Sequence, residues 1–86
     1  MKVAVWDTYV KRKDGRIMHF DIIVEESVTQ DKVLSYGKEY LIMKGEGEQE
    51  LTSKECKFCH IEEASPKIEQ AIRNKGYYIH EMQNCD

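Results

Sequence analysis

Two stretches near the start of the chain alternate apolar and polar side chains, which is the period of a β-strand. Residues 2 to 11 and 16 to 25 are rich in Val, Ile, Tyr, Phe and Trp, and Asp14-Gly15 lies between them. An Asp-Gly pair between two such runs is a strong signal for a β-hairpin. The pattern therefore predicts an antiparallel hairpin at the amino-terminal end.

The length of the turn decides which side chains share a face of this hairpin. If the loop is made of residues 13 to 15, Thr8 lies opposite Phe20, and Asp7 then lies opposite Asp21. A two-residue loop would shift the pairing by one residue and turn the first strand over. We favour the three-residue loop because it aligns the apolar side chains of both strands on one face.

The rest of the chain predicts a helix, a strand, a second helix and a last strand. Apolar residues recur at helical spacing from about 29 to 44 and again from 66 to 75. Strands are expected around 53 to 61 and from 77 to 82, where apolar and aromatic residues follow one another closely.

Capping residues mark the ends of both expected helices. Ser27 or Thr29 can cap the first helix, and Gly45 can end it. Ser65, which a proline follows, is a suitable start for the second helix, and Gly76 is a suitable stop.

The order β-β-α-β-α-β predicts an α+β fold in a single small domain over residues 1–86. We expect a mixed four-stranded sheet with both helices on one face. A strand, a helix and a further strand in one sheet normally form a right-handed parallel crossover. On this expectation the last two strands are parallel neighbours, and Cys59, His60 and Cys85 converge at one edge of the sheet.

The segment Cys56-Lys57-Phe58-Cys59-His60 places two cysteines and a histidine, all potential metal ligands, within five residues. A Cys-x-x-Cys turn supplies two thiolates for a tetrahedral zinc ion, and a further cysteine and a histidine can complete the site. His19 and His80 are the alternative histidines. The predicted metal ligands are Cys56, Cys59, His60 and Cys85.

Other interpretations of these cysteines remain open. Covalent haem attachment uses the same Cys-x-x-Cys-His motif, but it normally requires export of the protein. No apolar run of signal-peptide length begins the chain. A thiol-dependent redox switch or small enzyme would use Cys56 and Cys59, although such pairs favour a helix start and the nearest helix begins after Ser65. Two cysteines packed beside a strand are the simplest interpretation.

A second constellation of polar residues lies within the apolar hairpin strands. In the favoured register Asp7, Tyr9, His19 and Asp21 share a face, and the two carboxylates are directly opposed. Opposed carboxylates repel unless they share a proton or meet a cation or a histidine. The group therefore suggests either a general acid/base site or the solvent face of the hairpin.

The overall composition restricts the partners. The net charge of −3 gives no electrostatic reason to expect a nucleic acid or an anionic membrane. No stretch approaches the roughly 20 apolar residues of a membrane span. We expect a cytoplasmic protein that forms a small binding or structural module rather than an enzyme, with a homodimer through an exposed sheet face as one form.

The motifs VWDTYV (5 to 10), DGRIMHFDI (14 to 22), ECKFCHIE (55 to 62) and GYYIHEM (76 to 82) occur in this order, and NCD follows them. With them the chain resembles, over its whole length, a family of short bacterial proteins described only as a domain of unknown function. The resemblance implies a stand-alone bacterial cytoplasmic α+β protein. It implies no activity, substrate or cofactor.

Overall fold

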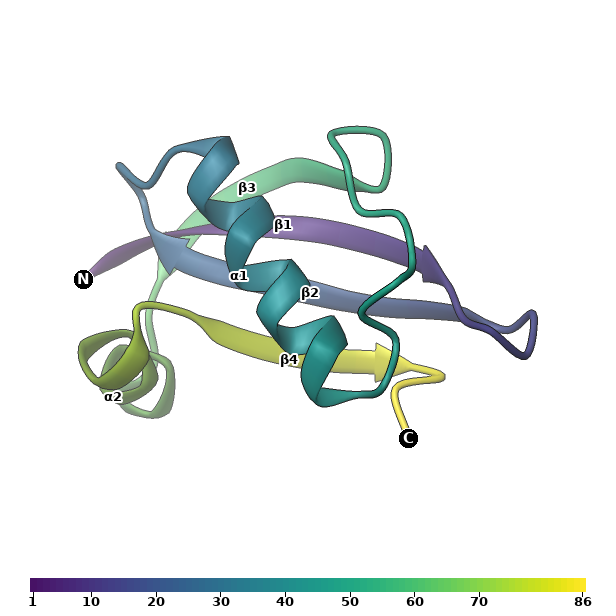
Figure 1. Cartoon of the computed structure of the whole chain (residues 1–86). Coiled ribbons are helices and arrows are strands. Elements are labelled where there is room, and N and C mark those ends of the chain that lie inside the picture. Colours follow the sequence, from purple (N-terminus) through teal and green to yellow (C-terminus); the bar gives the residue numbers. More distant parts are fainter.

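One four-stranded sheet and two helices make up the chain, and the computed structural model describes all of residues 1–86 (Figure 1). The elements are β1 (Lys2–Lys11), β2 (Ile17–Glu25), α1 (Gln30–Met43), β3 (Cys56–Glu63), α2 (Pro66–Lys75) and β4 (Tyr78–Gln83). This order confirms the predicted α+β fold. Neither helix is long and apolar enough to cross a membrane.

The strands lie in the order β3-β1-β2-β4, and every neighbouring pair is antiparallel (Figure 1). The expectation of a mixed sheet with parallel last strands is therefore wrong. The reason lies in where the chain ends β3 and begins β4: Glu63 pairs with Lys2, and Tyr78 pairs with Ile23, so both points are at the same end of the sheet. Helix α2 bridges that end instead of returning along the sheet, which leaves β3 and β4 at opposite edges.

The two helices pack on opposite faces of the sheet, so the expectation that both cover one face is also wrong. Helix α1 crosses the face that carries the main core (Figure 1). That core includes Ala4, Val10, Met18, Phe20, Ile22 and Val24 from the hairpin, and Val33, Tyr40 and Leu41 from α1. On the other face, Ile68 and Ile72 of α2 pack against a smaller cluster of Val3, Val5 and Ile23.

The hairpin has the favoured register. Thr8 pairs with Phe20, Asp7 pairs with Asp21, and Gly15 in the loop has a φ of 92°. An L side chain rarely adopts that φ, whereas glycine does so without steric cost. The three-residue turn therefore places the apolar side chains under α1 and the polar constellation on the other face.

The predicted capping residues mark both helices. Thr29 accepts a hydrogen bond from the backbone N–H of Lys32, and Ser65 accepts one from that of Ile68. Gly76 ends α2 in the left-handed conformation. Each cap satisfies a backbone group that the helix leaves without a partner.

Helix α2 covers only part of its face of the sheet. Its contacts are with the cluster of Val3, Val5 and Ile23, near the end where β1 begins and β2 ends. Side chains on the same face farther along the strands, toward the hairpin turn, have no helix above them. Because side chains alternate with period two, Asp7 and Asp21 are the first of these uncovered positions on the two central strands.

Candidate functional site

Asp7, His19 and Asp21 form a compact group on this uncovered face. Each is half-buried, and one potential ligand atom from each lies within 4.8 Å of the others. Nε2 of His19 is 2.5 Å from Oδ1 of Asp7. The structure therefore brings together three of the four polar residues that the favoured hairpin register places on one face.

The two central strands hold this cluster in place. Asp7 on β1 lies directly opposite Asp21 on β2, and His19 precedes Asp21 by two residues, so it lies on the same face, closer to the hairpin turn. The ring of Tyr9, which lies opposite His19, stacks on the imidazole with centroids 4.1 Å apart and an interplanar angle of 10°. The stacked ring of Tyr9 restricts the rotation of His19, and the contact with Asp7 orients Nε2.

The electrostatics of the cluster are unfavourable when both carboxylates are ionised. Burial raises the pKa of Asp21, and a hydrogen bond and charge repulsion with Asp7 raise it further. His19 and His80 act on the same pKa in the opposite direction. A raised carboxyl pKa is typical of two carboxylates that share a site.

His80 is a fourth residue of interest next to this cluster. It lies on β4 directly opposite Asp21, on the same face, and its side chain is exposed. Cross-strand neighbours have Cβ atoms about 4.5–5.5 Å apart, within reach of an imidazole ring. From the sequence, His80 is predicted only as an alternative metal ligand beside the cysteines. Its position opposite Asp21 could not be predicted, because it depends on the pairing of β4 with β2.

The predicted ligand set of Cys56, Cys59, His60 and Cys85 is dispersed. Cys56 is buried at the start of β3, and Cys85 is buried just after β4, at the opposite edge of the sheet. Cys59 is exposed. The convergence expected from parallel last strands is absent because β3 and β4 are not neighbours.

Two of the four predicted ligands nevertheless remain together. The β3–β1 register shifts between Val5 and Trp6, so Cys59 has no cross-strand partner and forms a β-bulge with His60. Nδ1 of His60 is 3.2 Å from Sγ of Cys59, and Nε2 is 2.7 Å from Oε1 of Glu62. This exposed Cys-His-Glu group is half of a possible metal site rather than a whole one.

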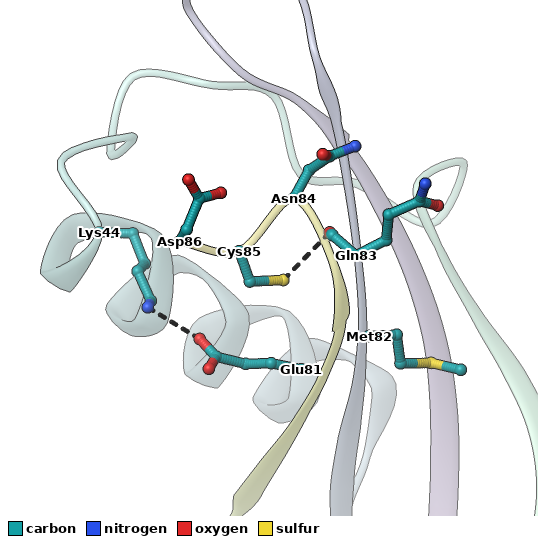
Figure 2. Close-up of a pocket in the computed structure, with 7 residues that line it drawn as sticks. All are labelled: Lys44, Glu81, Met82, Gln83, Asn84, Cys85 and Asp86. Atoms are coloured by element: carbon teal, nitrogen blue, oxygen red, sulfur yellow. Dashed lines mark hydrogen bonds and ion pairs between the residues drawn. The ribbon is translucent and has the colours of Figure 1, made fainter.

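The other two cysteines have the properties of packed thiols. Burial raises the pKa of Cys56, which disfavours the thiolate that redox chemistry requires. Sγ of Cys85 donates to the carbonyl oxygen of Gln83 at 3.3 Å (Figure 2). The same thiol donates to the carbonyl oxygen of His19 at 3.4 Å, and both contacts need the thiol proton.

Cys85 lines a pocket of ≈ 370 Å³ beside the carboxyl end of β4. Lys44 and Glu81 lie at its wall and form an ion pair of 2.8 Å (Figure 2). Glu81 also accepts a hydrogen bond from the hydroxyl group of Tyr40, so the charged groups of this pocket already have partners within the chain. The pocket therefore offers less free ligand chemistry than the uncovered sheet face.

Comparisons with known proteins agree with the fold and give no function. No curated protein matches the chain. The NMR structure of protein NE1680 from Nitrosomonas europaea, a target of the Northeast Structural Genomics Consortium, is 41% identical, covers 100% of both chains and superimposes with a TM-score of 0.89. The sequence model of one family matches residues 1–82, and the chain therefore belongs to that family, which is described as Domain of unknown function (DUF2024).

Proposed function

We propose that the protein is a binding module that holds one divalent transition-metal ion, with zinc as the first candidate, between Asp7, His19 and Asp21. The observation that carries this proposal is the convergence of three ligand atoms of suitable chemistry within 4.8 Å. Within a single copy of the chain, this cluster brings three ligand atoms together, whereas the predicted cysteine set is dispersed.

The donor set suits a transition metal. Imidazole nitrogen and carboxylate oxygen are ordinary zinc ligands, whereas magnesium and calcium favour oxygen alone. A divalent cation between Asp7 and Asp21 would also favour the ionised form of Asp21, whose pKa is raised by burial and by the neighbouring Asp7. When both carboxylates are ionised, their repulsion destabilises the metal-free cluster, and a bound cation would relieve that repulsion.

The surroundings of the cluster favour binding from solvent. Three protein ligands leave a coordination position open, as in zinc sites that keep a water molecule. His80 is the side chain placed to take that position, because it lies opposite Asp21 at the free edge of the sheet. Asp7 lies on β1, and His19 and Asp21 lie on the neighbouring strand β2, so the paired backbones already hold the three ligand atoms close together.

A thiol-dependent function has less support. Cys56 is buried with a raised pKa, and only Cys59 of the Cys-x-x-Cys pair is exposed. A redox pair needs an accessible, acidic thiol next to its partner.

Equilibrium dialysis of the metal-free protein against zinc, followed by elemental analysis, tests the proposal. All samples carry Cys59→Ser, so that the exposed thiol of Cys59 does not contribute to zinc binding. We expect one zinc per chain, and affinity lower by at least about 100-fold in His19→Gln and in Asp7→Asn, since even outer-shell changes cost 10- to 100-fold.

The matched control is Glu26→Gln, which removes one carboxylate charge at an exposed position outside the cluster. It should bind zinc as the Cys59→Ser parent does. Equal binding by the parent and by His19→Gln, or no zinc in the parent, would contradict the proposed site.

A further inference from the structure

Strand β3 is an exposed edge of the sheet. It pairs with β1 on one side only, and every residue after Cys56 is exposed. Phe58 and Ile61 are 53% and 42% exposed although both are large and apolar. An edge of this length presents unpaired backbone N–H and C=O groups, to which another strand can bind.

The sequence of β3 is complementary to itself. When two copies pair in antiparallel fashion about a two-fold axis between Cys59 and His60, Lys57 of one copy lies opposite Glu62 of the other. In the same register Phe58 lies opposite Ile61 of the second copy. Opposite charges and apolar pairs at facing positions stabilise adjacent strands.

The faces of the sheet agree with this register. Phe58 and Ile61 pair with Trp6 and Ala4 of β1, so both lie on the face that α1 covers. Lys57 and Glu62 lie on the other face, because they pair with Asp7 and Val3, respectively. A two-fold axis perpendicular to the sheet keeps each face on its own side, so both pairings can form at once.

We propose that two copies of the chain join through β3 into one continuous eight-stranded sheet, and that Cys59 and His60 of both copies form a zinc site on the two-fold axis. Next to the β-bulge, Nδ1 of His60 and Sγ of Cys59 are already 3.2 Å apart, so both atoms can bind the same ion. Two such halves supply the four ligands of a tetrahedral Cys₂His₂ site. Neither copy completes this site alone.

Besides pairing with Lys57 of the second copy, Glu62 can orient the ring of His60. Its Oε1 lies 2.7 Å from Nε2 of His60, so it accepts the N–H of that ring nitrogen when Nδ1 binds the metal. A carboxylate behind a metal-bound histidine fixes the tautomer and the ring orientation. The Cys59 thiol loses its proton to solvent on binding, which makes the dimer sensitive to pH.

Light scattering of the eluting protein tests the proposal in His19→Gln, which lacks the first proposed metal site. With zinc, we expect twice the chain mass of 10.1 kDa and one zinc per two chains. With excess chelator, or in the additional variant Cys59→Ser, the dimer should weaken by about tenfold or more, since the chelator removes the metal and the variant loses one of the two ligands that each copy supplies.

A charge reversal tests the edge itself. Lys57→Glu places like charges opposite each other twice per dimer and should weaken it by about tenfold or more, whereas Lys57→Arg should retain it. Lys38→Glu, an equal reversal on the exposed side of α1, is the matched control. The single tryptophan, Trp6, contacts Phe58 at 5.7 Å between ring centroids, so its fluorescence should change on dimerisation.

Three outcomes would overturn the proposal. They are a 10.1 kDa species with zinc at all concentrations, a dimer that Lys57→Glu leaves intact, and a dimer of Cys59→Ser as stable as that of its parent. These results are separate from those for the first site, because His19→Gln removes that site from every sample.

Discussion

Replacement of Asp21 by asparagine should affect stability and metal binding in opposite directions. Asp21 is half-buried in the centre of β2, directly opposite Asp7. Asparagine keeps the shape of the side chain and removes its charge. Because the pKa of Asp21 is raised in the folded protein, its contribution to stability is complete at low pH and is lost as the pH rises through the raised value. Once Asp21 is ionised, the metal-free protein therefore contains a repulsion between Asp7 and Asp21 that Asp21→Asn removes.

The magnitude follows from the cross-strand geometry. A directly opposed pair of like charges on a half-buried sheet face costs about 0.5–1 kcal/mol. For a domain of this length that corresponds to an unfolding midpoint about 2–8 °C higher in the variant without metal. Zinc at 100 times its dissociation constant stabilises the natural sequence by about 2.7 kcal/mol, and the variant by much less.

Thermal unfolding with zinc and with excess chelator measures both effects. It should be carried out at neutral pH and at acidic pH, because the advantage of the variant should shrink as Asp21 becomes protonated. Glu26→Gln is again the control for the removal of one charge. The reasoning fails if Asp21→Asn is less stable than the natural sequence without metal at neutral pH, or if zinc raises both midpoints equally.

Three further predictions concern other parts of the molecule. His80→Gln should weaken zinc binding at the first site by about 10- to 100-fold without changing metal-free stability, as measured by indicator competition; unchanged affinity would exclude His80 as a ligand. Iodoacetamide should label Cys59 in the native, chelator-treated protein and should reach Cys56 only after unfolding, because Cys56 is 0% exposed and its pKa is raised; fast native labelling of Cys56 would revive the thiol-dependent function. Glu46→Gln should lower the free energy of unfolding in denaturant by about 3 kcal/mol, because Glu46 and Arg12 form an ion pair of 3.1 Å with side chains only 8% and 9% exposed; a change below about 1 kcal/mol would show that the pair is not effectively buried.

Local features of the chain could be predicted from the sequence because their causes are local. The alternation of the hairpin strands, the Asp14-Gly15 turn and the helix caps each depend on a few neighbouring residues, and the structure has them in place. The register with Asp7 opposite Asp21 also follows from local turn geometry. For this reason the polar face of the hairpin was recognisable as a candidate site.

The arrangement of the edge strands could not be predicted in the same way. The preference for a parallel crossover applies when a helix returns along the sheet. No feature of the α2 sequence indicates that this helix instead bridges one end of the sheet. That one choice of path separates Cys85 from Cys59 by the whole width of the sheet. It also brings His80 opposite Asp21, which no local pattern indicates.

The same topology explains why the candidate ligands gather on one side of the sheet. All three histidines of the chain lie on the face that α1 does not cover: His19 beside Tyr9, His60 opposite Val5 and His80 opposite Asp21. The α1 face carries the large apolar core and can fix the strands without help from the other side. Because the shorter helix α2 covers only one end of its face, the remaining surface is free to hold polar groups that would be too costly to bury. Metal at either proposed site would therefore bind to strands whose positions the opposite face already fixes, and its ligands would need little ordering on binding.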